Sequence, residues 1–387
     1  MSGRLSHWRR VPADAAAWFD ADEIARGRAY NRPIERVQRV RTALSAVAAV
    51  IFIVADAGPR LVRTLDVDGW ALQAAVVIVA FVGLEFIIGP WFDAWRELVH
   101  DRKWELSTQT VRGFVLDEIK GALVALVMTL VLLIPLWAIV RATTLWWLWG
   151  WLLFSAFTVA LGMLYPVLIA PLFNKFTPLD EGPLRTRIFE VARRCELDVN
   201  EVLVADASRR SLAGNAYVAG LGRTRRVVLF DTILEWPAEV VVQVVAHELG
   251  HWRHAHLRRK VPVVIAIQFL LFVAVWALLR WDWLLDLGGV SSVRDPAAIP
   301  IFASLFPAGF IGASLVTSWL SRADERQADI YALDVLEEPD EFSDVFRRLA
   351  EKNKADVDPS TWKRLAASHP PIPERLAMAR QWQEVSA

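Results

Sequence analysis

Two histidines and a glutamate in one short segment carry the strongest chemical signal in this sequence. They stand in the pentapeptide His247-Glu248-Leu249-Gly250-His251. Because His247 and His251 are four residues apart, a helix places both imidazoles on one face, where both can bind one metal ion. Glu248 can then present its carboxylate to water beside that ion and act as the general base of a peptide hydrolysis. Such a pentapeptide arises by chance in about one chain in a hundred of this length, so other residues must support the site.

A catalytic zinc ion needs a third protein ligand, and the best candidate is Glu325. It lies just after the last apolar stretch of the chain, and the histidine segment lies just before the preceding one. Both segments therefore meet one membrane face, although a solvated helix start remains the alternative for Glu325. Asp329, four residues further on, can accept the ring N–H of a ligand histidine. Cys195, in an apolar helical context, and His254 and His256, too close on the same helix, are expected to stay outside the metal site.

The elements that must position these residues belong to a membrane protein. Of the 387 residues, 55% are hydrophobic and 19 are tryptophan, and the mean hydropathy is +0.33, which excludes a disordered chain. The 43 basic and 43 acidic residues balance, so global charge gives no argument for nucleic-acid binding. Six apolar stretches stand out, at 42–62, 69–91, 121–140, 144–170, 261–279 and 299–320. Most of them reach the roughly 20 residues that are needed to cross a bilayer core.

The basic residues predict the orientation of these spans. Of the 43 lysines and arginines, 38 lie in segments 1–41, 92–120, 171–260 and 321–387, which we expect on the cytoplasmic side. No apolar signal segment precedes the first span. The excess of arginine over lysine, 36 to 7, favours a GC-rich bacterial source, and hence the bacterial plasma membrane.

These predictions divide the chain into five parts. They are a cytoplasmic N-terminal segment (1–41), four spans with a cytoplasmic loop at 92–120 (42–170), a cytoplasmic protease domain with the histidine helix (171–260), two further spans (261–320), and a cytoplasmic C-terminal part that carries Glu325 (321–387). Within the polar parts, hydrophobic periodicity predicts a small α+β unit. Its predicted elements are helices at 184–195 and 237–256, strands at 201–205, 215–219 and 226–230, and C-terminal helices at 322–353, with a break near Pro339, and 374–384.

Further motifs spread over most of the chain point to one protein family. They are Pro171-Leu172-Phe173-Asn174-Lys175-Phe176-Thr177-Pro178-Leu179, Asn215-Ala216-Tyr217, Val228-Leu229-Phe230-Asp231-Thr232, Glu325-x-x-Ala328-Asp329 and His369-Pro370-Pro371-x-Pro373-Glu374-Arg375. Together with the histidine pentapeptide, they resemble the type I CAAX prenyl proteases, which are integral-membrane zinc metalloendopeptidases. The likeness extends from about Asp20 to Leu376.

The resemblance implies a zinc centre and its chemistry. One Zn²⁺ per chain would be bound by His247, His251 and Glu325, with Glu248 as the catalytic base. His369 would help to stabilise the tetrahedral intermediate, a role that suits a positioned hydrogen-bond donor. The implied fold is mostly α, a polytopic bundle of about six membrane spans with a cytoplasmic α+β metalloprotease domain of the gluzincin type.

The resemblance also implies how substrate is held. Asn215, Ala216 and Tyr217 look like the edge strand of the family, which binds an extended peptide by β-augmentation. Arg375 matches an arginine near the site. We expect peptide or membrane-protein substrates and contact with the lipid bilayer, no nucleic-acid partner, and a substrate that need not be prenylated if the source is bacterial. The sequence predicts no oligomeric state.

Two other classes of protein compete with this interpretation. An intramembrane site-2-type protease would carry the histidine motif within a span, but Arg258, Arg259 and Lys260 follow this one at once. A transporter with a structural zinc domain would need four protein ligands and paired charges inside the membrane. The sequence instead offers three ligands, a base and few intramembrane charges.

Overall fold

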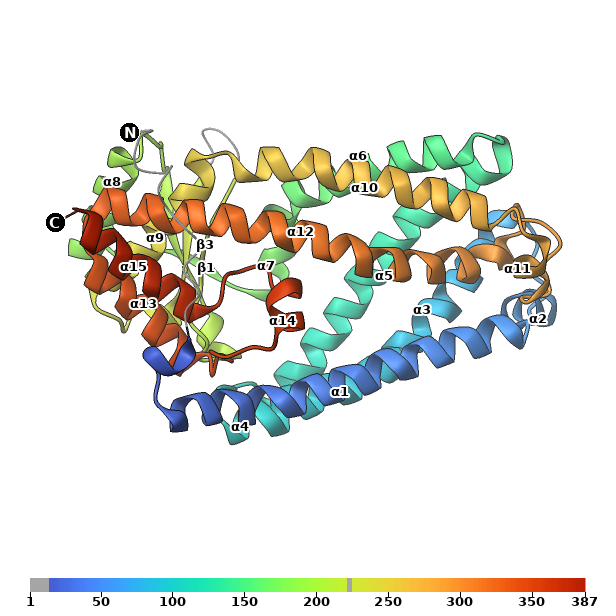
Figure 1. Cartoon of the computed structure of the whole chain (residues 1–387). Helices are drawn as coiled ribbons and strands as arrows, with labels where there is room; N and C mark the ends of the chain where they lie inside the picture. The colour runs from blue at the N-terminus through green and yellow to red at the C-terminus, as the bar shows by residue number, and fades with distance from the viewer. Residues whose placement is uncertain (1–13, 221–224, 387) are drawn as a thin grey trace.

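The computed structural model describes residues 14–220 and 225–386, and within them the protein is mostly helical. Six helical segments of the described chain are long and apolar enough to cross a membrane. They are built on α1 (Ala21–Val54), α3 (Trp70–Ala94), α5 (Val111–Ala142), α6 (Trp146–Leu164), α10 (His256–Leu278) and α12 (Ile299–Leu336). Figure 1 shows α12 running from the end of the molecule that holds α2 and α11 to the end that holds the sheet. The expected polytopic bundle is confirmed.

The spanning helices combine a buried core with apolar outer faces. Trp137 of α5 and Phe272 of α10 are fully buried at the centre of the bundle. Ile87 and Trp91 of α3 are instead 68% and 78% exposed, as expected for side chains that face lipid. Gln268 of α10 is buried and forms hydrogen bonds with two α6 hydroxyls, so the polar group is satisfied inside the bundle.

Short elements connect the spans. They are α2 (Ala57–Thr64) and α11 (Asp282–Asp286) at one end, and α4 (Asp101–Lys103) and α7 (Ala170–Phe173) at the other. Two π-helical turns, Trp95–His100 and Tyr165–Ile169, extend α3 and α6 toward α4 and α7.

Two helices run through boundaries that polarity predicts. Helix α1 begins at Ala21 because Asp20 and Glu23 form a capping box, and it continues unbroken past residue 41. It ends at Val54, earlier than the predicted 62, and Asp56 then takes a left-handed conformation with φ 50°. Helix α12 likewise continues past residue 320 to Leu336. A change from polar to apolar composition therefore predicts where a helix enters or leaves apolar surroundings, but it does not predict where the helix ends. Residues 1–13 of the predicted N-terminal segment lie outside the described residues.

In the described chain, four strands form one small sheet beside the bundle. They are β1 (Phe176–Pro178), β2 (Glu201–Ala205), β3 (Ala216–Ala219) and β4 (Arg226–Phe230). The order is β1-β2-β4-β3, with β2 and β4 parallel and the two outer pairs antiparallel. Strand β3 therefore lies at an edge and pairs with β4 alone, with Ala216 opposite Leu229.

Further helices accompany the sheet. They are α8 (Pro183–Arg194), α9 (Ala238–Arg253), α13 (Pro339–Lys352), α14 (Thr361–Ala366) and α15 (Ile372–Ser386). One of them, α9, packs against both β3 and α12 of the bundle. Helix α9 buries Val241, Val245 and Leu249 at the centre of the core. Its Gly250 lies so close to α12 that an added Cβ would come within 3.2 Å of the Ala328 Cα. Small residues at these two positions let α9 and α12 approach each other, which brings the segment with Glu325 against the histidine helix.

The N-terminal half of α1 contacts the segment between α13 and α14. An added Cβ at Gly27 would clash with the carbonyl oxygen of Ala355, so the two backbones touch there. Arg28 forms an ion pair with Asp358, and Asn31 donates a hydrogen bond to the Lys354 carbonyl. The N-terminal helix thus supports the chain that leads into the C-terminal part of the site.

Candidate active site

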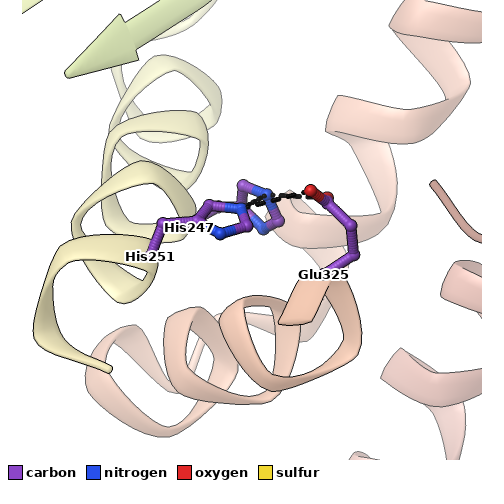
Figure 2. A group of neighbouring side chains, drawn as sticks. All are labelled: His247, His251 and Glu325. Carbon is purple, nitrogen blue, oxygen red and sulfur yellow. Dashed lines mark hydrogen bonds and ion pairs between the residues drawn. The ribbon is translucent and has the colours of Figure 1, made fainter. Parts of the chain in front are cut away.

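The three predicted metal ligands meet between α9 and α12. The Nε2 atoms of His247 and His251 are 3.1 Å apart. The Glu325 carboxylate lies 3.2 Å from the first of these nitrogens and 3.3 Å from the second. Figure 2 shows both imidazoles on one helix pointing toward the carboxylate of the other. Among the described residues, these three form the one group of histidine, cysteine and acidic side chains able to hold a metal ion.

The chemistry of this donor set fits a divalent cation. The Nδ1 atoms of His247 and His251 are each 2.8 Å from an outer partner, Asp329 and His256 respectively. With Nδ1 of each ring donating to its outer partner, both Nε2 atoms can present lone pairs to one cation. Oε2 of Glu325 is buried without a hydrogen-bond partner. Ligand atoms of a tetrahedral ion with bonds of about 2.0–2.2 Å lie roughly 3.3–3.6 Å apart, close to the separations found here.

A buried charge pair supports the first ligand. Asp329 is fully buried, and Arg375 donates to its carboxylate through Nε at 2.8 Å and through Nη2. The Arg375 guanidinium also lies 4.0 Å from the centre of the Phe346 ring. Burial alone would lower the pKa of His247, but the Asp329 carboxylate outweighs it and raises that pKa to about 9. The site therefore carries enough negative charge to hold a cation at His247.

Glu248 stands beside the ligands without joining them. It lines the same cleft as His247, and burial raises the pKa of its carboxyl above the ordinary value. A carboxylate whose pKa moves toward neutrality is a better general base near pH 7. Position and environment thus agree with the expected role.

His369 reaches the site from the segment that precedes α15. Its Nε2 lies 3.4 Å from Oε1 of Glu325, and its side chain is 60% exposed on the open side of the cleft. The buried Arg322 of α12 fixes this segment, because it donates to the carbonyl oxygens of Leu365 and Ala367 at 2.7 and 2.6 Å. The same helix therefore supplies Glu325 and holds the chain that places His369 next to it.

A cleft of about 600 Å³ opens beside these groups. One wall is apolar and consists of Trp236, Phe342, Val345, Phe346 and Leu349. Asn215 and Ala216 at the start of β3 also line the cleft, and Arg375 lies at the end next to His247. Tyr217 is not among the lining residues. Successive side chains of a strand point to opposite faces, so Tyr217 turns away from the face that Ala216 presents.

The edge of β3 offers a backbone donor to this cleft. The Phe230 N–H donates to the Asn215 carbonyl at 3.0 Å, so the next pair along the ladder, Ala216 and Leu229, is not hydrogen-bonded across the strands. The Ala216 N–H therefore points to the free edge, where the Asn215 side-chain oxygen accepts it at 2.9 Å. Asn353 holds the preceding residue, Gly214, by accepting from its N–H at 3.0 Å and donating to its carbonyl at 3.3 Å.

Sequence reasoning missed two features of this site. It expected His256 only to stay outside the metal site and did not predict that this side chain is 2% exposed and lies 2.8 Å from His251. Ala255, with φ 52°, lies between α9 and α10 and turns the chain back so that His256 returns to His251. The apolar wall was also missed, although Phe342, Val345, Phe346 and Leu349 recur at helical spacing and could have been found. Cys195 is buried in the core and is not part of the metal cluster, as expected.

Comparison with known proteins agrees with this geometry. Residues 178–383 match the model of peptidase family M48. Residues 4–175 match a second model, described as the CAAX prenyl protease N-terminal domain with five membrane helices. The chain belongs to peptidase family M48. Membership confirms the resemblance found in the sequence motifs.

Individual relatives support the same assignment. The chain is 31% identical over 307 residues to a CAAX prenyl protease 1 homolog of Oryza sativa, which covers 74% of this chain and 68% of the relative. It is 29% identical over 283 residues to the uncharacterized metalloprotease YhfN of Bacillus subtilis, covering 72% and 66%. The crystal structure of S. mikatae Ste24p has the same fold, with a TM-score of 0.82 over 96% of this chain and 92% of that one at 24% identity.

This member of family M48 is therefore an integral, multi-pass membrane metallopeptidase. Its family implies a metal cofactor, and the cluster of two histidines and one glutamate is suited to hold it. The matches do not favour the site-2-type protease or the transporter.

Proposed function

We propose that this peptidase is a zinc-dependent endopeptidase, with one Zn²⁺ per chain held by His247, His251 and Glu325. One observation carries the proposal: the Nε2 atoms of His247 and His251 are 3.1 Å apart and each lies within 3.3 Å of a Glu325 carboxylate oxygen, and Glu248 lines the cleft beside them. Two nitrogens and a carboxylate oxygen are the ligands of a catalytic zinc, which keeps a further position open. Zinc supplies Lewis acidity, which polarises a peptide carbonyl and makes water a stronger acid.

The protein groups around the metal have separate roles in the reaction. Glu248 takes a proton from the attacking water and passes it to the departing amine. His369, on the open side of Glu325, donates a hydrogen bond to the carbonyl oxygen as negative charge develops on it. Arg375 neutralises Asp329, and Asp329 fixes the ring of His247.

The walls of the cleft favour an extended peptide as substrate. The free edge of β3 can add a peptide strand through the backbone of Ala216, with Asn215 and Tyr217 flanking it. The apolar wall on α13 favours a hydrophobic side chain near the scissile bond. The plant relative is named for CAAX prenyl proteolysis; for this chain we propose the broader class of membrane-associated proteins and peptides.

The charge distribution supports a site on the cytoplasmic side. Segments holding 38 of the 43 lysines and arginines, including the parts that carry the metal ligands, fall on one side of the predicted spans. The excess of arginine over lysine favours the plasma membrane of a bacterium.

Metal removal and return tests the proposal. The detergent-purified protein should cleave internally quenched peptides that carry hydrophobic residues and should contain about one zinc per chain. A chelator should abolish cleavage, and one equivalent of Zn²⁺ should restore it. Cleavage that persists in fully metal-free protein would contradict the proposal. Mass spectrometry of peptides retained by a Glu248→Gln protein in its own membrane would then identify natural substrates.

A further inference from the structure

A third histidine supports the metal site from outside the ligand set. His256 begins α10, and its side chain is 2% exposed. Its Nδ1 lies 2.8 Å from Nδ1 of His251, the ring nitrogen that does not face the metal position. The left-handed conformation of Ala255 places it there, so the contact depends on the turn between α9 and α10.

The hydrogen bonds around His256 allow one assignment of protons. Nε2 of His251 must keep a lone pair for the metal, so Nδ1 of His251 carries the proton and donates a hydrogen bond to Nδ1 of His256. His256 then carries its own proton on Nε2, which faces the Gln327 side-chain oxygen at 3.0 Å. The Gln327 amide nitrogen donates to Nδ1 of His254 at 3.0 Å, and Arg259 donates to the Gln327 oxygen at 3.3 Å. Every donor in this chain finds an acceptor.

The two ligand histidines therefore have different outer partners. His247 contacts the anionic Asp329, whereas His251 contacts a neutral imidazole. The nearest carboxylate to His256 is that of Asp324, 3.8 Å from Nε2, and Arg259 and Lys260 already pair with it at 3.3 and 3.4 Å. No carboxylate is within hydrogen-bond distance of His251 Nδ1 in the described chain, so His256 is the group that accepts the hydrogen bond from this nitrogen.

We propose that His256 is a positioning residue that fixes the tautomer and ring orientation of His251 for metal binding. This inference rests on the proposed function, since it takes His251 as a zinc ligand. Without an acceptor at Nδ1, His251 is free to move its proton to Nε2 or to rotate, and either change removes a ligand atom. Loss of such an outer partner lowers metal affinity by about 10- to 100-fold.

Three substitutions at His256 separate this role from simple packing. His256→Ala removes the acceptor. His256→Asn keeps one, because the amide oxygen of asparagine can occupy the place of the imidazole Nδ1. His256→Gln extends the amide toward the place of Nε2 and Gln327 and leaves His251 without its acceptor. His254→Ala is the matched control, because it removes a neighbouring imidazole that contacts Gln327 and no metal ligand.

The readout is the zinc dissociation constant of the detergent-purified full chain, measured by chelator competition, together with the visible spectrum of the Co²⁺-substituted protein. We expect zinc binding to weaken by about 10- to 100-fold in His256→Ala and His256→Gln, with an altered Co²⁺ spectrum. His256→Asn and His254→Ala should stay within about 3-fold of the parent, well short of that loss.

The outcomes separate this inference from the proposed function. If the parent binds zinc tightly and His256→Ala binds it equally well, the positioning role is wrong and the zinc centre stands. If His256→Ala and His256→Asn lose zinc equally and unfold at the same lowered temperature, His256 is merely structural and the inference is also wrong. A parent protein that holds no zinc would overturn the proposed function itself.

Discussion

Replacing Ala216 by proline tests whether β3 holds the substrate. The Ala216 N–H points to the free edge, so its loss removes no ladder hydrogen bond to β4. Proline is tolerated at an edge position whose N–H faces away from the ladder. Within the chain, the substitution removes the hydrogen bond from Ala216 N to the Asn215 side chain at 2.9 Å. The main effect of the substitution should therefore be the loss of a hydrogen bond to the bound peptide.

The expected magnitude follows from that one lost donor. A peptide carbonyl left without its partner in the cleft costs about 1–3 kcal/mol. Through transition-state binding, this corresponds to a fall in kcat/KM of about 5- to 150-fold. Displacement of the scissile carbonyl from the metal would add to the loss. Ala216→Ser keeps the backbone donor and should fall much less.

The assay compares kcat/KM for a quenched peptide, zinc content and thermal unfolding in the parent and both variants. Zinc content should not change, because neither substitution touches a ligand. Tyr217→Pro is a useful contrast, because Tyr217 donates within the ladder opposite Val228 and its loss should lower stability first. If folded, zinc-loaded Ala216→Pro protein cleaves peptide at the parent rate, β3 is only structural and the model of substrate binding is wrong.

Three further predictions concern the metal, the topology and the N-terminal helix. Glu325→Ala should lower both zinc content and cleavage, because two histidines hold the metal weakly; full zinc retention would assign the third ligand elsewhere. Reporter fusions after Phe173 and at the C-terminus should report the cytoplasm and one near Val293 the exterior, and any other pattern contradicts the predicted orientation. Gly27→Ala should displace the segment at Ala355 and lower kcat and thermal stability while zinc stays bound; unchanged kcat and stability would show that the contact is dispensable.

The cluster of His247, His251 and Glu325 could be predicted because half of its pattern is local and the other half follows from the order of the spans. The spacing of His247 and His251 fixes one helical face, and Glu325 follows the next apolar stretch on the same side of the membrane. Strands β2 and β4 match their predicted bounds, since both are short apolar runs bounded by polar residues. The close approach of α9 and α12 is consistent with two small residues in the motifs, Gly250 in the histidine pentapeptide and Ala328 in the motif that begins at Glu325.

Features that depend on single backbone conformations could not be predicted. The contact between His256 and His251 requires the left-handed Ala255, a conformation that alanine rarely adopts and that no sequence pattern announces. The hydrogen bonds between the Asn353 side-chain amide and the Gly214 backbone likewise join residues that are far apart in the chain. Tyr217 entered the predicted substrate site as part of a contiguous motif, and only the position of β3 shows that it does not line the cleft.

The central claim is that one bound metal and one separate base perform the hydrolysis, and Glu248→Gln tests it most directly. The substitution removes the base and keeps all three ligands, with nearly unchanged side-chain volume. Purified mutant protein should hold the same zinc per chain as the parent, while peptide cleavage falls by about 10²- to 10⁴-fold. Parent-level cleavage by the zinc-loaded mutant would contradict the account, and loss of zinc together with activity would make Glu248 a ligand in place of a base.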